Sequence, residues 1–126
     1  MKRIVLLVAL AACSKSPEQQ PPPAQHIGGH VQKDPTTAKQ LIANGATVLD
    51  VRNPDEFAGG HVSQATNMPV NSLDVAAVDK LTGGDRAKPV VVYCAKGGRA
   101  QKAKEKLEAA GYTHVVNGGG YDDLSR

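Results

Sequence analysis

A cysteine placed between a strand-like run and a helix-like run is the feature of this sequence that most suggests chemistry. The run VVVYC, residues 90–94, is apolar and rich in β-branched residues, as in a strand covered on both faces. Four residues follow, and Arg99 then opens a run with helical periodicity. Cys94 is therefore expected at the carboxyl end of a buried strand, where parallel α/β sheets bind their ligands.

The residues around this cysteine are suited to stabilising negative charge on sulfur. The glycine-containing stretch 95–98 allows backbone N–H groups to turn inward as an anion-binding nest. The helix start after it contributes unpaired N–H groups and the positive end of its dipole, and Arg99 adds a full charge. A thiolate held in this way can attack a polar substrate. We therefore predict a nucleophilic Cys94, although a free cysteine is often only a small buried hydrophobe.

Runs typical of strands and helices alternate from residue 31 onward, and these elements must position the cysteine loop. Asp34 followed by Pro35 is typical of a helix start, and Asn53 followed by Pro54 repeats the pattern. Further helices are expected at 71–81 and 99–110, strands at 46–51, 65–68, 90–94 and 112–116, a turn at 117–120, and a short helix or tail at the end. This alternation predicts an α/β domain with a mainly parallel sheet.

Composition limits the chain to one globular domain. It has 126 residues, of which 40% are hydrophobic and 21% charged, as in ordinary folded proteins. Fifteen basic residues face 12 acidic ones, and Lys2 and Arg3 account for two of the three excess positive charges. No basic patch with interleaved aromatic residues is present, so nucleic-acid binding is not expected.

The N-terminus MKRIVLLVALAAC has the layout of a secretory signal. A basic start precedes an apolar stretch that is too short to span a bilayer. The segment LAAC resembles the lipobox of bacterial lipoproteins, in which cleavage falls before a cysteine that carries lipid. We expect residues 1–12 to be a lipoprotein signal peptide and Cys13 to be a membrane anchor that leaves the protein facing the periplasm, with Ser14 favouring the outer over the inner membrane. In the alternative, an ordinary signal peptide, Cys13 is incidental.

Residues 13–30 are expected to form the anchor and an extended tether rich in Pro and Gln. His26 and His30 are four residues apart, but the intervening glycines disfavour the helix that would let them share a metal ion. We expect no metal and no cofactor. A disulfide between Cys13 and Cys94 is possible by count, but the two cysteines are expected to act separately.

Three segments resemble the rhodanese family, in the order in which that family has them. VLDVRNPDEFAGGHVSQATNMP is similar to the family signature, VVVYCAKGGRA to its active-site loop, and NGGGYDDL to its closing Gly-Gly segment. The resemblance covers nearly all of the domain expected at residues 31–126. It implies a three-layer α/β/α fold with a five-stranded parallel sheet.

The resemblance also implies a sulfurtransferase of the thiosulfate type. Cys94 would take a sulfane sulfur from a donor such as thiosulfate, become a persulfide, and pass the sulfur to cyanide or a thiol. Asp50 and Arg52 match family positions near the site and are interpreted as structural, hydrogen-bonding the loops around Cys94. The family's loop amides and donor-attracting charges correspond here to Ala95, Lys96, Gly97, Gly98 and Arg99.

Other functions are weighed against this hypothesis. Phosphatases related to this fold have five residues between cysteine and arginine, whereas four intervene here, which makes a smaller cradle. A non-enzymatic module that binds a persulfide or a partner is a second alternative, disfavoured because Cys94 is present. If Cys13 carries lipid, no second thiol remains for disulfide exchange of the Cys-x-x-Cys kind. A monomer is the default expectation.

Overall fold

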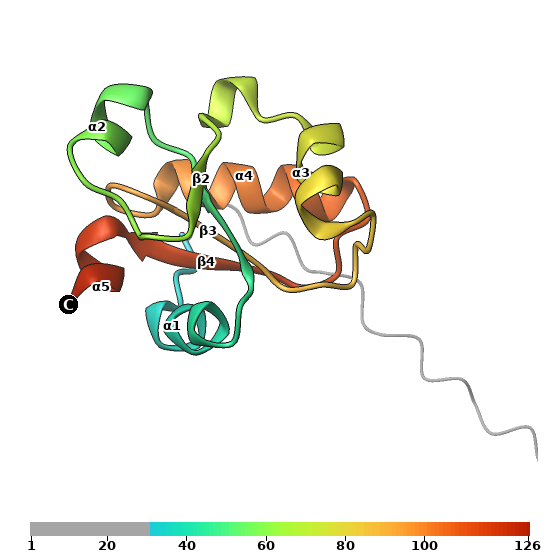
Figure 1. Cartoon of the computed structure of the whole chain (residues 1–126), viewed down its shortest axis with the longest axis horizontal. Helices are drawn as coiled ribbons and strands as arrows, with labels where there is room; N and C mark the ends of the chain where they lie inside the picture. Colours follow the sequence, from blue (N-terminus) through green and yellow to red (C-terminus); the bar gives the residue numbers. More distant parts are fainter. Residues whose placement is uncertain (1–30) are drawn as a thin grey trace, which may run out of the picture.

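Four strands make one parallel sheet in the order β2-β1-β3-β4 (Figure 1). The strands are β1 (Thr47–Asp50), β2 (Ala65–Asn67), β3 (Val90–Cys94) and β4 (Val115–Gly120). The structure is a computed structural model that describes residues 31–126. The expected signal peptide, the Cys13 anchor, the tether and the pair His26 and His30 lie outside the described residues.

Helices cover both faces of this sheet, as Figure 1 shows. Helices α1 (Pro35–Ala43) and α5 (Tyr121–Ser125) pack on one face. Helices α3 (Val75–Thr82) and α4 (Gly98–Ala109) pack on the other. The short helix α2 (Pro54–Ala58) follows β1, and a 3₁₀ turn at Val70–Ser72 precedes α3. The predicted α/β fold with a parallel sheet is confirmed.

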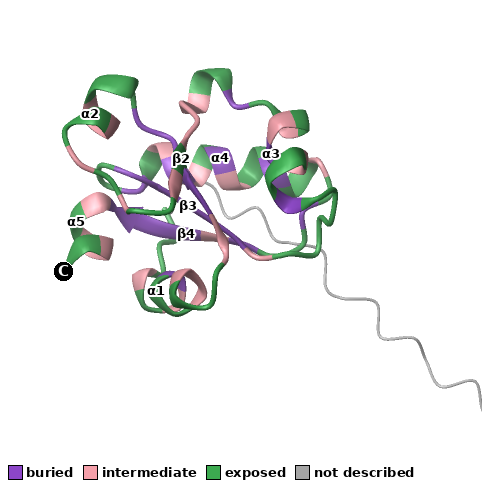
Figure 2. Ribbon diagram, viewed as in Figure 1, coloured by how far each residue is buried: buried purple, intermediate pink, exposed green. Residues whose placement is uncertain are grey.

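Strand β3 lies at the centre of the core, and all five of its residues are buried (Figure 2). Because successive side chains of a strand point to opposite faces, Val92 and Cys94 join the cluster beneath α3 and α4. Val91 and Tyr93 join the cluster beneath α1 and α5. Burial on both faces explains why the run 90–94 is apolar without alternation.

Helix starts and stops follow the local signals. Asp34 accepts a hydrogen bond from the Thr37 N–H at 3.0 Å, with Pro35 as the first helical residue. Asp74 caps α3 in the same way through the Ala76 N–H. Gly83 ends α3 with a positive φ of 68°, a conformation that favours glycine.

Two expectations about strands are wrong in detail. The described residues contain four strands rather than five, since residues 31–34 run beside β4 with one backbone bond, from the Asp34 N–H to the Asn117 carbonyl at 2.7 Å. Residues 117–120, expected as a turn, instead complete β4. The glycines suggested a turn, but pairing with β3 keeps this segment in the sheet.

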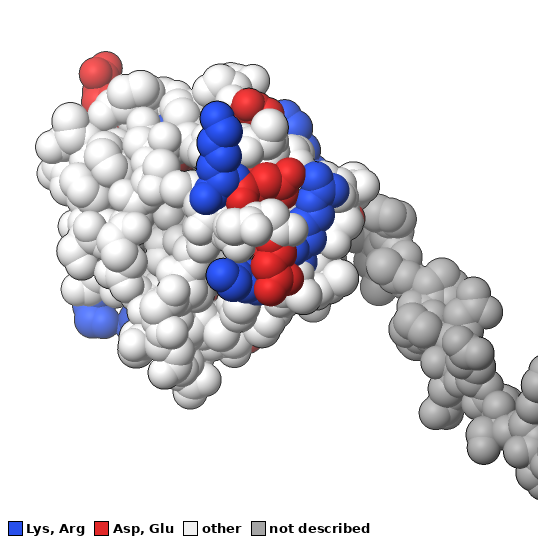
Figure 3. Space-filling model, turned by 45° about the vertical axis from the view of Figure 1, so that its right-hand side comes forward, with Lys and Arg blue, Asp and Glu red and all other residues white. Residues whose placement is uncertain are grey.

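Acidic and basic side chains are mixed on the face drawn in Figure 3. The ion pairs of the described residues include Arg86–Asp79 and Lys104–Glu108. No helix within residues 31–126 combines the length and the apolar character needed to cross a membrane.

The packing of α4 on the sheet yields a stability prediction. Leu107 is fully buried between α4 and the strands, so Leu107→Ala should lower the free energy of unfolding by about 2–5 kcal/mol. Leu81 on α3 is 44% exposed, and Leu81→Ala should cost less than about 1 kcal/mol. Urea denaturation of both variants measures the difference, and equal losses would contradict the assigned core.

Candidate active site

Cys94 ends β3, and its thiol lies beneath the loop that follows. The residue is 1% exposed, and its Sγ accepts a hydrogen bond from the Gly97 N–H at 2.9 Å. Ala95, Lys96 and Gly98 are exposed, so an incoming group has to approach from the side of the loop. The loop therefore combines a buried sulfur with a backbone donor aimed at it.

Helix α4 begins directly over this sulfur. Gly97 is its N-cap, with a φ of 111° that disfavours any side chain. The first N–H groups of a helix have no partner within the helix, and its N-terminal end carries partial positive charge. The helix start predicted next to Cys94 is therefore present, and its donors lie at the sulfur.

A bulge in β4 gives the loop its support. Val92 pairs with Asn117 and Cys94 pairs with Gly120, so two steps along β3 face three along β4. The extra residue is accommodated at Gly119, whose φ is 86°. The Asn117 side chain accepts from the Gly119 N–H at 2.9 Å and donates to the Gly97 carbonyl at 3.0 Å. One buried amide thus joins the bulge to the residue that donates to the sulfur.

Gly120 makes the closest approach to the loop. A Cβ placed on it would lie 2.2 Å from the Ala95 carbonyl oxygen, closer than any real contact. Its own φ of −96° is open to any residue, so the requirement for glycine is one of space. The closing Gly-Gly segment therefore fits against the cysteine loop.

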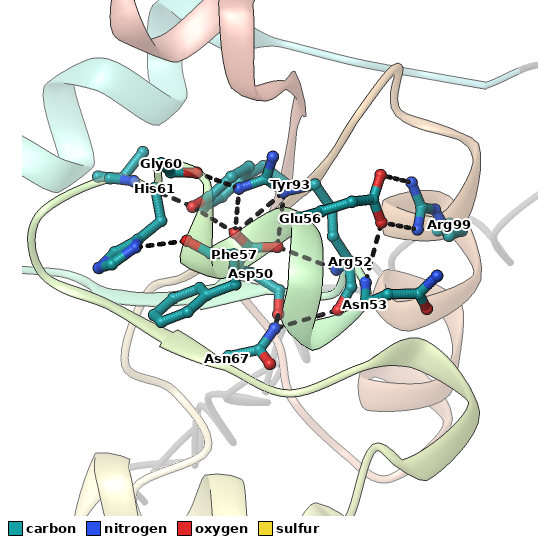
Figure 4. A network of polar contacts seen from close by, with 11 residues as sticks. Asp50, Arg52, Asn53, Glu56, Phe57, Gly60, His61, Asn67, Tyr93 and Arg99 are labelled. Atoms are coloured by element: carbon teal, nitrogen blue, oxygen red, sulfur yellow. Dashed lines mark hydrogen bonds and ion pairs between the residues drawn. The ribbon is translucent and has the colours of Figure 1, made fainter.

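A buried carboxylate holds the adjoining end of β1 (Figure 4). Asp50 is fully buried and accepts from the Arg52 guanidinium, with the shortest contact 2.7 Å, and from the Tyr93 hydroxyl at 2.8 Å. Burial is the main reason that the pKa of the Tyr93 hydroxyl is raised, which keeps it a donor. Since Tyr93 precedes Cys94, this network fixes β3 next to the cysteine.

Arg52 connects the Asp50 network to the loop at Gly60 and to the Tyr121 ring. Its guanidinium donates to the Gly60 carbonyl at 2.6 Å and lies 4.9 Å from the centre of the Tyr121 ring. The Asn67 side chain donates to the carbonyls of Asp50 and Arg52. The sequence predicts that Asp50 and Arg52 hydrogen-bond the loops around Cys94. In the structure Arg52 bonds the α2–β2 loop at Gly60, and Asp50 bonds Tyr93, which precedes Cys94.

Arg99 is held by a residue to which sequence reasoning assigned no role. Its two terminal nitrogens donate to the two carboxylate oxygens of Glu56, at 2.8 and 3.0 Å (Figure 4). The guanidinium lowers the pKa of Glu56 to about 2, aided by the Asn53 N–H. The pKa of Arg99 is raised, first by Glu56 and to a lesser extent by the nearby Cys94 sulfur.

The structure brings the predicted site residues together at one edge of the sheet. The loop 95–98 joins Cys94 to Arg99. Asp50 and Arg52 lie on the other face of the sheet, where Asp50 accepts from the Tyr93 hydroxyl. The individual roles assigned to these residues stay predictions. Glu56, Asn117 and Gly120 were missed as contributors, and the signals that could have indicated them are the motif PDEF and the glycine run NGGG.

Other parts of the described chain offer less chemistry. An open pocket lies at the opposite end of the sheet, between Leu41, Leu81 and Pro89, away from the cysteine. His61 stacks on Phe57 and lies exposed at the α2–β2 loop. Within residues 31–126, no group of three or more His, Cys, Asp and Glu side chains is arranged to hold a metal ion.

Comparison with known families agrees with this arrangement. The family Rhodanese, described as a rhodanese-like domain, matches residues 34–125. The chain belongs to the rhodanese family. Its carboxyl-edge cysteine loop and glycine-rich last strand are therefore parts of a rhodanese domain.

Curated relatives of this rhodanese domain include two bacterial thiosulfate sulfurtransferases. Thiosulfate sulfurtransferase GlpE of Ectopseudomonas mendocina is 35% identical over 89 residues, which cover 70% of this chain and 78% of the relative. Thiosulfate sulfurtransferase PspE of Escherichia coli is 36% identical over 77 residues, covering 61% and 72%. These relatives are matched over most of their length.

Two solved structures are similar to this chain in fold. A rhodanese with anions from E. coli matches with a TM-score of 0.56 and 35% identity, covering 64% of this chain and 93% of that one. The human single-domain sulfurtransferase TSTD1 matches with a TM-score of 0.57 and 25% identity, covering 77% and 96%.

The tight contact at Gly120 yields a prediction about the loop. Gly120→Ala should displace Ala95, lower the free energy of unfolding by about 1–3 kcal/mol and speed hydrogen exchange of the Gly97 amide. Gly59→Ala is the control, since its nearest neighbours are 3.5 Å away, and it should change stability by less than about 0.5 kcal/mol. Unchanged protection of Gly97 in Gly120→Ala would contradict the proposed support.

Proposed function

We propose that this protein is a sulfurtransferase that carries sulfane sulfur on Cys94. The observation on which this depends is the Cys94 sulfur, which accepts a backbone N–H at the carboxyl end of the central strand, beneath a helix N-terminus. This arrangement favours a thiolate and the anion that forms when the thiolate attacks. The family membership and the thiosulfate sulfurtransferases among its relatives support the same activity.

The reaction divides into two balanced steps. The Cys94 thiolate attacks the outer sulfur of thiosulfate, the S–S bond of the donor breaks, and sulfite leaves with the bonding electron pair. The product is a Cys94 persulfide anion. Cyanide or a thiolate then attacks its terminal sulfur, which leaves as thiocyanate or a new persulfide and restores the Cys94 thiolate.

The residues around Cys94 have distinct parts in these steps. The Gly97 N–H donates to the attacking sulfur, and the N-terminus of α4 stabilises the negative charge of both the thiolate and the persulfide. The exposed Lys96 has no ion-pair partner among the described residues and is positioned to attract an anionic donor. The cycle uses only the sulfur and this fixed polar environment.

We also propose that the domain is attached to the cell envelope by lipid on Cys13, facing the periplasm, with the outer membrane favoured. The support is the sequence LAAC after a basic start and an apolar stretch, followed by Ser14. Lipid chains contribute about 0.8 kcal/mol per buried methylene, so several chains together would hold the protein on a membrane.

The sulfur cycle predicts a mass change at one residue. Full-length protein treated with thiosulfate should gain one sulfur atom on the peptide that contains Cys94, and cyanide should remove it with release of thiocyanate. Cys94→Ser should abolish both while leaving the unfolding transition unchanged, since serine is close to cysteine in size. Turnover retained in Cys94→Ser would refute the mechanism.

The lipid anchor predicts a change of cell fraction. In a bacterial host that processes lipoproteins, the wild-type protein should sediment with membranes and its N-terminal peptide should carry acyl chains. Cys13→Ser should lose the acyl mass and leave the mature protein off the membrane or unprocessed. N-terminal peptides that carry no acyl chain in either protein, and that differ only by the exchange of sulfur for oxygen, would show that Cys13 is incidental.

A further inference from the structure

The positive charge expected to attract the donor is already engaged. Both terminal nitrogens of Arg99 face the Glu56 carboxylate, in the parallel two-bond geometry that guanidinium and carboxylate groups prefer. Glu56 comes from α2 and Arg99 from the first turn of α4, so the pair joins the loop after β1 to the helix above Cys94. An anionic donor that approaches Arg99 therefore meets Glu56 as well.

The Glu56 carboxylate is fixed in this position and stays charged. One of its oxygens also accepts from the Asn53 N–H at 3.0 Å, which caps α2. With its pKa lowered to about 2, Glu56 is ionised at every pH at which a thiolate could act. The side chains of Arg99 and Glu56 remain 33% and 36% exposed, so a donor in solution senses both charges.

The charge that a donor meets at the loop is thus smaller than the sequence suggests. Lys96 and Arg99 supply two positive charges, and Glu56 cancels one. Coulomb energy scales with the product of the charges, so the repulsion from Glu56 is twice as large for a dianion as for a monoanion. Glu56 therefore weakens the attraction of the loop for an anionic donor in proportion to the charge of that donor.

We propose that Glu56, by holding Arg99, sets the donor class of this site, disfavouring doubly charged donors relative to singly charged ones such as an alkyl persulfide anion. This inference rests on the proposed sulfur transfer at Cys94 and assigns to Glu56 a positioning role, because it acts through Arg99. Thiosulfate is still a donor, but one that reacts against the charge of Glu56.

Two donors that differ by one charge test this directly. Thiosulfate is a dianion, and methanethiosulfonate is a monoanion that delivers the same outer sulfur and releases methanesulfinate in place of sulfite. In the full-length protein, Glu56→Gln should raise kcat/KM for thiosulfate about tenfold and for methanethiosulfonate about threefold, since the free-energy gain doubles with donor charge. Both gains should shrink as salt is added, because the groups are partly exposed.

Two further variants separate charge at this position from other effects. Asp55→Asn removes the same charge from the same helix, and Asp55 forms no ion pair with Arg99, so this variant should leave the ratio of the two kcat/KM values within about twofold of wild type. Glu56→Asp keeps the charge and should also keep the ratio, even if the shorter side chain lowers stability. If Glu56 had a purely structural role, its substitution would instead change kcat/KM by the same factor for both donors.

The outcomes are distinct. A larger gain for the dianion in Glu56→Gln, with the ratio unchanged in Asp55→Asn, supports the proposal. Equal changes for both donors, or an equal ratio shift in Asp55→Asn, overturn it while leaving sulfur transfer intact. If mass analysis finds no sulfur on Cys94 of the wild type with either donor, the proposed function itself fails, and this inference fails with it.

Discussion

The buried carboxylate of Asp50 is the constraint around which the site is built. An ionised group without solvent contact must be paired and hydrogen-bonded, and here Arg52 and the Tyr93 hydroxyl meet that need. Removing one partner of such a group typically costs about 3–5 kcal/mol, because the other charge is left buried. The ends of β1 and β3 and the loop at Gly60 are therefore held in one arrangement.

The Asp50 network holds the backbone next to Cys94, although the Cys94 side chain is not part of that network. Tyr93 points to the face of the sheet that carries the charged network, and the next residue points to the opposite face, beneath α4. The backbone is thus fixed on one side while the sulfur is presented on the other. On that side the bulge at Gly119 and the side chain of Asn117 hold Gly97, whose N–H reaches the sulfur.

The two ion pairs near the site have different consequences, because one is buried and the other is partly exposed. The pair Asp50–Arg52 is buried and holds backbone in place, whereas the pair Glu56–Arg99 is partly exposed at the end of the Cys94 loop. Exposed pairs contribute little to stability, so the consequence of Glu56 is better sought in what the site accepts. In the proposed cycle the N-terminus of α4 acts on every donor alike, and the Glu56 carboxylate would add a distinction by donor charge.

The sequence by itself determined the α/β alternation, the helix starts after Asp34 and Asn53, and the loop from Cys94 to Arg99, because these depend on neighbouring residues. It predicted a turn at 117–120, which was wrong, since pairing with β3 overrides the local preference of glycine. The five strands that the family resemblance implies are four within residues 31–126. Only the tertiary structure decided that Asn117 reaches Gly97, 20 residues away, and that Glu56 holds Arg99, 43 residues away. Such contacts arise where distant segments meet in the folded sheet, and no local pattern in one sequence specifies them.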